Sequence, residues 1–139
     1  MRYVQAGLDA DGRSRVTREE EIDLAAGRTM LYRVPPGAAS PPPGSARSLD
    51  LGVRPGEVSW LVTRFEPGFR YGMHHTDTAD LHIVLEGRAE LVLDDGPHEL
   101  RAGDAVAVTG VDHAWRVDAE GCTFAMLFVG TVPHPAADS

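Results

Sequence analysis

The chain has 139 residues, one cysteine and a formal net charge of −8, with 21 acidic against 13 basic side chains. This charge argues against nucleic acid and against an anionic membrane surface as partners, and no apolar run approaches the roughly 20 residues of a membrane-spanning helix. Because Cys122 cannot form an internal disulfide and residues 1–9 lack the apolar core of a signal peptide, we expect one domain located in the cytoplasm.

Fifteen glycines and ten prolines divide the chain into segments that are mostly too short for helices, which indicates an all-β sandwich or barrel. Residues 3–7 and 14–17 flank a turn signal at residues 9–12 and are expected to form a hairpin. Thr17-Arg-Glu-Glu20 also matches a capping box, so a short helix there is an alternative that the sequence leaves open. Residues 28–34 are expected to form a further strand.

A loop rich in proline and glycine, residues 35–56, separates these N-terminal strands from the main body, residues 57–132. In the main body, short apolar segments alternate with turns, and Asp94-Asp95-Gly96 is a strong hairpin signal. Besides the segment that follows Asp80, the expected strands lie at residues 58–65, 89–93, 98–100, 105–109, 113–117 and 123–129. The tail, residues 133–139, is expected to be disordered.

Histidines gather in one stretch, residues 68–87, which holds three of the six in the chain. These are His74, His75 and His82, and Asp80 lies among them. Imidazoles and carboxylates next to core residues are costly to bury unless they bind a metal, bind a ligand or pair with each other. The stretch therefore predicts where the chemistry of this protein takes place.

The same stretch resembles the first motif of the cupin superfamily: Gly, five residues, His-x-His, three or four residues, Glu, six residues, Gly. Gly68, His74, Asp80 and Gly87 stand at the matching positions. Residues 73–80 are similar, more closely, to a subgroup of small bacterial cupins that carries Met-His-x-Thr-x-Thr-x-Asp. The second cupin motif, Gly-Asp with a histidine about ten residues later, is similar to Gly103-Asp104 followed by His113.

The resemblance implies a cupin-type antiparallel β-barrel, a double-stranded β-helix, over residues 1–132 with additional N-terminal strands. It also implies a divalent metal ion held by three histidines and a glutamate. This sequence departs from that pattern at two positions, because Thr76 replaces the second histidine and Asp80 replaces the glutamate.

Strand alternation offers a substitute for the missing ligand, since Asp80, His82 and Val84 share one face of a regular strand. The set His74, His82, His113 and Asp80 then supplies three imidazoles and a carboxylate, which suit Fe, Mn, Ni or Zn alike. In the alternative, His82 lines the cavity without binding metal, and Asp80 only orients a histidine by accepting its N–H. In either case Asp80 and His82 are the candidates for moving a proton.

Other residues are candidates for contacting a small molecule. Trp115 shares a face with His113 and offers a platform for a flat ligand, with ordinary core packing as the alternative. Thr76 is expected at the same site. Arg64 and Arg70 are candidate anchors for an anionic ligand. His75 is expected on the opposite face from His74, at the surface or the rim.

The first hypothesis is a metal-dependent cupin enzyme of the oxygenase, isomerase, lyase or decarboxylase type. The alternatives are a metal-free acid–base enzyme, such as an isomerase, cyclase or dehydratase, and a non-catalytic small-molecule binder. We rank an enzyme first because ionisable groups are concentrated on one inferred interior face. The resemblance implies a substrate of the aromatic or polyketide-like kind. The outward apolar face formed by Leu81, Ile83 and Leu85 predicts a homodimer, unless the N-terminal strands cover it.

Overall fold

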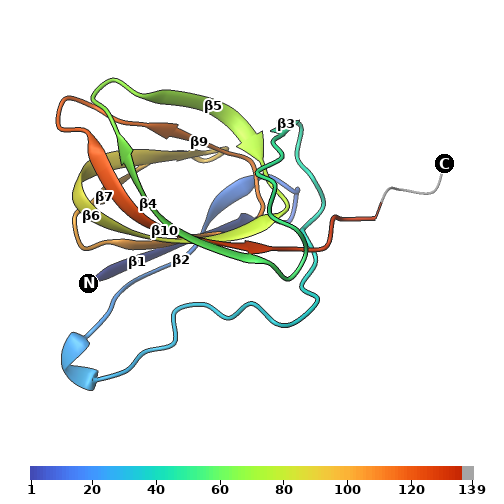
Figure 1. Ribbon diagram of the computed structural model, residues 1–139, viewed down its shortest axis with the longest axis horizontal. Helices are drawn as coiled ribbons and strands as arrows, with labels where there is room; N and C mark the ends of the chain where they lie inside the picture. Colours follow the sequence, from blue (N-terminus) through green and yellow to red (C-terminus); the bar gives the residue numbers. More distant parts are fainter. Residues whose placement is uncertain (136–139) are drawn as a thin grey trace.

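The structure is a computed structural model that describes residues 1–135, and it is built almost entirely of strands (Figure 1). In chain order the elements are β1 (Arg2–Leu8), β2 (Ser14–Glu21), the 3-10 turn η1 (Leu24–Ala26), β3 (Arg47–Ser48), β4 (Val58–Phe65), β5 (Arg70–His75), β6 (Thr78–Leu93), β7 (Gly96–Arg101), β8 (Ala105–Val108), β9 (His113–Arg116) and β10 (Cys122–Gly130). The predicted cupin-type barrel is confirmed. Nowhere in residues 1–135 is there a helix of the length and apolarity needed to cross a membrane.

Strand β6 is long and belongs to both walls of the barrel. Its first half lies between β8 and β10, where Asp80 is opposite Val108 on one side and Phe128 on the other. Its second half lies between β7 and β9. Between the halves, Gly87 has a φ of 76°, and a Cβ there would lie 2.1 Å from the carbonyl oxygen of Gly121, so only glycine fits.

The two halves of β6 face different surroundings. Leu91 and Leu93 on the second half belong to a dry hydrophobic cluster that includes Leu100 and Val117. The first half carries Asp80 and His82 into the barrel instead. The hydrophobic cluster continues from the second half to the wall of this inner space, where it includes Trp115 and Met126.

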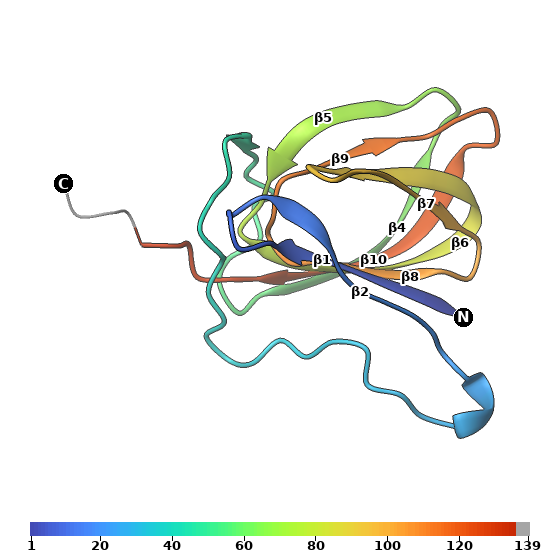
Figure 2. The ribbon, with the colours of Figure 1, turned by 180° about the vertical axis from the view of Figure 1, so that it is seen from behind.

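The N-terminal segment forms a hairpin throughout, so the helix alternative at Thr17-Arg-Glu-Glu20 is wrong. The β1–β2 register runs from Arg2 opposite Glu21 to Leu8 opposite Ser14. Strand β1 adds to the barrel sheet by parallel pairing with β8 (Figure 2). The hairpin therefore extends the sheet at its edge and does not cover the outer face of β6.

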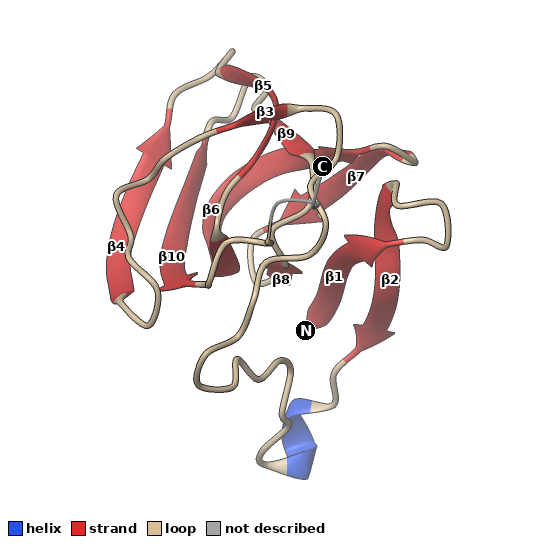
Figure 3. Cartoon of the chain, turned by 90° about the vertical axis from the view of Figure 1, so that its right-hand side faces the viewer, coloured by secondary structure: helices blue, strands red, loops and turns tan. Residues whose placement is uncertain are grey.

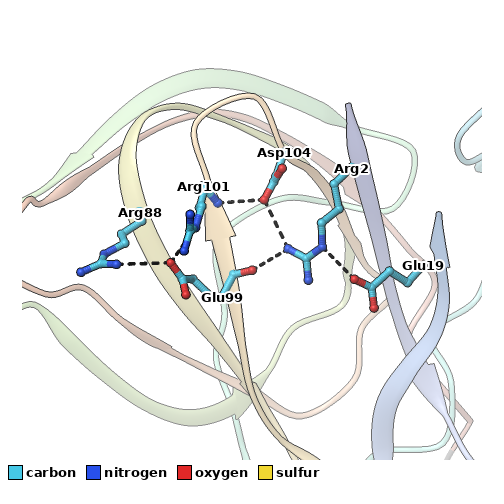
Figure 4. Close-up of polar contacts among 6 residues, drawn as sticks. All are labelled: Arg2, Glu19, Arg88, Glu99, Arg101 and Asp104. Atoms are coloured by element: carbon cyan, nitrogen blue, oxygen red, sulfur yellow. Dashed lines mark hydrogen bonds and ion pairs between the residues drawn. The ribbon is translucent and has the colours of Figure 1, made fainter. Parts of the chain in front are cut away.

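Arg2 fastens this hairpin to the turn before β8 (Figure 4). Its Nε donates to Glu19 at 2.7 Å, and its Nη1 donates to the carbonyl oxygen of Glu99 at 2.5 Å and lies 3.3 Å from Asp104 Oδ2. Asp104 also accepts the backbone N–H of Arg101 at 2.8 Å and so closes the turn. The Gly-Asp pair of the second motif thus has a structural part in this protein.

The predicted strand at residues 28–34 is wrong. The chain between β2 and β3 leaves the barrel as an extended arm with η1 at its outer end (Figure 3). Leu31 and Tyr32 on this arm line a groove with Leu81 and Leu127 on the outer sheet face. The arm crosses that face and does not lie along a strand edge, so it has no ladder to join. Residues 136–139, part of the tail expected to be disordered, lie outside the described residues.

Candidate functional site

A cavity of about 320 Å³ lies inside the barrel, between β4, β6 and β10 on one side and β5 and β9 on the other. Most of its lining is aromatic or aliphatic, with one group of ionisable side chains. In chain order the lining residues are Leu49, Leu51, Leu61, Thr63, Phe65, Phe69, Tyr71, His74, Thr76, Asp80, His82, His113, Trp115, Met126 and Phe128. This composition is typical of a small-molecule site.

Strand alternation places most of these side chains. Asp80 and His82 of β6, and His113 and Trp115 of β9, project inward two residues apart, as expected for a pleated strand. The cavity therefore brings together the predicted residues His74, Thr76, Asp80, His82, His113 and Trp115.

His74 and His113 form a matched pair on neighbouring strands, with ring centroids 4.3 Å apart. Nδ1 of His74 lies 2.9 Å from the carbonyl oxygen of Gly72, and Nδ1 of His113 lies 2.8 Å from that of Val111. A carbonyl oxygen only accepts, so in each neutral ring Nδ1 carries the hydrogen and Nε2 keeps a free lone pair. Burial lowers the pKa of both rings, that of His113 to about 3, with the neighbouring His74 as a further cause.

Asp80 ends a short chain of hydroxyl groups. The Thr78 hydroxyl donates to Asp80 Oδ1 at 2.5 Å, and the hydroxyl oxygens of Thr76 and Thr78 are 2.7 Å apart. Because Thr78 has a single hydroxyl hydrogen, Thr76 must donate to Thr78 in this arrangement. Burial raises the pKa of Asp80 to about 7, and the hydrogen bond from Thr78 opposes that shift.

His82 lies next to Asp80 with part of its ring unpartnered. Its Nε2 is 4.0 Å from Asp80 Oδ2, too far for a hydrogen bond, and its Nδ1 is buried without a partner in the described part of the chain. The rings of Phe124 and Phe128 pack around it at centroid distances of 6.0 and 5.1 Å. Burial lowers the pKa of His82 to about 4, so the ring is neutral at neutral pH.

The four expected metal ligands line the same cavity but are not arranged as a metal site. No group of three or more His, Cys, Asp or Glu side chains within residues 1–135 is arranged to hold a metal ion. His74 and His113 do present two free Nε2 atoms, but one oxygen of Asp80 is bound by Thr78 and His82 packs beside Asp80. As they stand, the donors therefore fit two ligands and do not fit the complete set.

Arg64, expected to contact the ligand, points out of the barrel. Leu61, Thr63 and Phe65 of β4 line the cavity, so alternation turns Arg64 to the outer face. There its guanidinium donates to the carbonyl oxygen of Glu120 at 3.2 Å. Arg70 likewise donates to the Val117 carbonyl at 3.1 Å.

Sequence reasoning missed part of the lining. Tyr71 lies against His74, with ring centroids 4.7 Å apart, although regular alternation would separate residues three apart. A register irregularity between the two brings both into the cavity. Leu49 and Leu51 come from the loop after β3, where no periodic pattern points to them.

His75 is bound at the rim, as expected. Its Nδ1 lies 2.8 Å from Oδ1 of the buried Asp112, and Oδ2 of Asp112 accepts the backbone N–H of Ala46 at 3.1 Å. Asp112 therefore joins β5 to the segment that leads into Leu49 and Leu51.

Comparisons with known proteins agree with this architecture. The family model described as Cupin domain matches residues 61–130. Phomopsin biosynthesis cluster protein C' of Diaporthe leptostromiformis is 34% identical over 108 residues, which cover 77% of this chain and 50% of that protein. Dimethylsulfoniopropionate lyase DddW of Ruegeria pomeroyi is 32% identical over 68 residues, covering 48% and 45%. The chain thus spans about half the length of these curated relatives.

Among solved structures, a protein of unknown function from Rhizobium leguminosarum is similar, with a TM-score of 0.49 and 26% identity, over 57% of this chain and 73% of that one. A protein containing a cupin-2 domain from Shewanella frigidimarina has a TM-score of 0.45 and 24% identity, over 52% and 70% of the two chains.

Proposed function

The chain belongs to the cupin family, and we propose that it is an enzyme that moves protons on a small organic molecule, with Asp80 and His82 as the acid–base pair. The observation that carries this proposal is the placement of Asp80, which is buried on the cavity wall with its pKa raised to about 7. An acid–base group is most effective when its pKa lies near the working pH. Isomerisation, cyclisation and dehydration are the reaction types that need such a group.

The two side chains have complementary parts in this mechanism. At neutral pH the Asp80 carboxyl is divided between its two protonation states, so it can take a proton from carbon or return one. The hydroxyl hydrogen bond from Thr78 stabilises the carboxylate form. His82 is neutral, and its Nδ1 is buried without a hydrogen-bond partner among residues 1–135, so this atom can meet a substrate after the ring turns toward the cavity. Pairs whose environments push their pKa values apart are typical of acid–base sites.

The curated relatives support a small organic substrate. Two of them carry names from phomopsin biosynthesis, one from oryzines biosynthesis and one is named as a lyase. Each match covers only part of the relative's length, so we take from these names the small size of the substrate and not the reaction.

A metal-dependent enzyme is the second candidate, favoured by one observation. The free Nε2 lone pairs of His74 and His113 are side by side, and both rings are oriented through Nδ1 by backbone carbonyls, as is common for metal-binding histidines. A divalent Fe, Mn, Ni or Zn ion held there would polarise a substrate oxygen. Asp80 and His82 would then move the proton in this candidate as well.

Proton exchange in deuterium oxide tests both candidates. The probe is β-tetralone, an enolisable bicyclic ketone, and deuterium uptake next to its carbonyl is followed by NMR. We expect uptake above the buffer rate, unchanged by EDTA, and lowered about 100-fold or more in Asp80→Asn. Asp118→Asn, an exposed carboxylate that pairs with Arg70, is the matched control.

Each other outcome of this experiment has a clear meaning. Activity that EDTA removes and one added ion restores would establish the metal-dependent candidate, provided that metal analysis of untagged protein finds that ion. Equal uptake with wild type and Asp80→Asn would overturn the acid–base assignment of Asp80.

We also propose that the active form is a homodimer. Trp60 is 82% exposed, Val62 66% and Leu85 53%, and all three lie on the outer face of the sheet formed by β4, β10 and β6. An apolar groove of about 280 Å³ adjoins them between this face and the arm. A second copy offers the same apolar surface, so a two-fold contact would cover both faces at once.

A further inference from the structure

The cavity contains no cationic side chain. None of its lining residues among positions 1–135 is lysine or arginine. Arg47 lies opposite His74 in the β3–β5 pairing but is not a lining residue, and it is engaged by Tyr71, with its guanidinium carbon 5.1 Å from the ring centroid and Nη2 donating to the Tyr71 hydroxyl at 2.7 Å. Arg64 and Arg70 are bound to backbone carbonyls elsewhere.

The polar groups in the cavity are neutral or acidic. Nδ1 of His74 and Nδ1 of His113 each donate to a backbone carbonyl oxygen, and Asp80 accepts from the Thr78 hydroxyl, so the hydrogen bonds of these groups call for no positive charge in the cavity. An anionic ligand would lose its hydration without gaining a counter-charge, which is costly in an apolar site. The cavity therefore selects against carboxylates and phosphates.

Nearly parallel rings line one wall. Phe65 and Phe69 have centroids 4.5 Å apart with an interplanar angle of 21°, and Phe69 and Tyr71 are 6.4 Å apart at 19°. Trp115 and Phe128 line other parts of the same cavity. Aromatic walls of this kind favour a flat ligand, which can stack or meet ring edges over its whole area.

The imidazole pair adds a hydrogen-bonding requirement. Because Nδ1 of His74 and of His113 is committed to a backbone carbonyl, each Nε2 can only accept. The ligand must then bring the hydrogen. A hydroxyl group satisfies either ring, and two adjacent hydroxyls satisfy both.

We infer that the cavity binds an uncharged, planar hydroxyaromatic compound whose hydroxyl donates to Nε2 of His74 or His113. The inference rests on the proposed function only in taking the same cavity as the substrate site. A volume of about 320 Å³ limits the ligand to a few fused rings.

Calorimetric titration with three matched bicyclic probes tests this ligand class. β-Naphthol is uncharged and donates a hydrogen bond, β-methoxynaphthalene lacks the donor, and β-naphthoate carries a negative charge. We expect β-naphthol to bind at least tenfold more tightly than each of the others. Equal or tighter binding of β-naphthoate would overturn the selection against anions, and equal binding of the methoxy compound would overturn the hydroxyl contact.

A positive charge placed inside the barrel should reduce or remove the preference for the uncharged probe. Leu61 lines the cavity and is 40% exposed, so an arginine at this position can reach both the ligand and water. Leu61→Arg is expected to raise β-naphthoate affinity at least tenfold. Ala102, exposed in the turn before β8 and away from both faces of this sheet, provides the control, and Ala102→Arg should leave that affinity unchanged. An equal gain in both variants would show that surface charge alone binds the probe and would overturn the inference.

The stacking wall has its own variant. Phe69→Leu keeps an apolar side chain but removes the ring between Phe65 and Tyr71, and it should weaken β-naphthol about tenfold while leaving the circular dichroism spectrum unchanged. Unchanged affinity would overturn the stacking contact.

These results separate the ligand class from the reaction. Preferential β-naphthol binding without β-tetralone exchange would keep the ligand class and refute the proposed acid–base function. Catalysed exchange together with preferential β-naphthoate binding would do the reverse.

Discussion

The sheet formed by β4, β10 and β6 has ionisable side chains on its buried inner face and large apolar side chains on its exposed outer face. On the inner face Asp80 and His82 are each only 3% exposed. On the outer face, one residue further along the same strand, Ile83 is 39% exposed, and Trp60 on β4 reaches 82%. Ionisable groups are thus buried and large apolar groups face solvent. Both arrangements are unfavourable in an isolated barrel, and under the proposals above each would be relieved by a different occupant: a ligand inside and a second copy outside.

The largest expected effect is on the rate of exchange, and it should differ between substitutions at two neighbouring residues of β6. His82→Gln should lower the rate of β-tetralone exchange about 100-fold, because it removes a neutral base from the cavity. Ile83→Leu, at the next residue, keeps the outer face apolar and should leave that rate unchanged. Deuterium uptake measured by NMR for both variants decides the matter. A similar loss in both would mean that the strand responds as a whole and that the two faces are not independent.

The second effect concerns the outer face. Trp60→Glu should convert the dimer into a 15.0 kDa monomer at micromolar concentration, since a buried carboxylate would oppose the contact. Light scattering across a dilution series measures the change. Ala102→Glu, in the exposed turn before β8, adds the same charge away from this face and should remain dimeric. A wild-type protein that is monomeric throughout would refute the dimer.

The inward and outward side chains of the regular strands could be predicted from the sequence. Period-two alternation put Asp80 with His82 and His113 with Trp115 on shared strand faces, and the resemblance to the two cupin motifs indicated that both faces point into the barrel, where the structure has them in one cavity. The same rule gave the outward apolar residues.

The remaining features depend on departures from regularity that local sequence does not encode. Tyr71 enters the cavity through an irregularity in the β5–β9 register. Leu49 and Leu51 enter from a loop whose path is set by tertiary hydrogen bonds, among them Leu49 N–H to the carbonyl oxygen of His75 at 2.8 Å. Residues 28–34 have the composition of a strand but reach no free edge. Alternation along β4 gives two sets of residues but does not tell which set faces the cavity, so it could not predict that Arg64 points outward.

The third effect is on stability and has opposite signs for the two inner groups. His82 has its pKa lowered from 6.5 to about 4, so below pH 6.5 the unfolded chain binds a proton that the folded chain does not. Its contribution to the free energy of unfolding therefore falls, on the order of 1–2 kcal/mol between about pH 6.5 and pH 5. Asp80 has its pKa raised to about 7, so the folded chain binds the proton first and gains stability over the same acid range.

Variants separate these two contributions. Urea unfolding from pH 8 to pH 5 should show a shallower acid loss for His82→Gln than for wild type and a steeper loss for Asp80→Asn. A difference in unfolding free energy between a variant and wild type that is already present above pH 7.5 comes from altered packing and not from titration. Parallel curves for all three proteins would show that neither group is desolvated as described.

The smallest effect tests the loop that closes the inner face. Asp112 accepts from Ala46 N–H with one oxygen and pairs with His75 through the other, so it fastens the segment that carries Leu49 and Leu51 into the cavity. Asp112→Asn keeps the volume but replaces one acceptor by a donor, which should cost about 1 kcal/mol of local stability. We expect roughly tenfold faster amide exchange at Ala46, with the strands of the outer face unaffected.

A matched change within the same loop is Asp50→Asn, since Asp50 accepts only the nearby Gly52 N–H from an exposed position. That variant should leave exchange at Ala46 as in wild type. If β-naphthol binding slows the exchange at Ala46 in wild type but not in Asp112→Asn, then the loop responds to the cavity through this carboxylate. If the ligand protects both proteins equally, the loop is ordered by contact between Leu49, Leu51 and the ligand, and Asp112 has no part in closing the inner face.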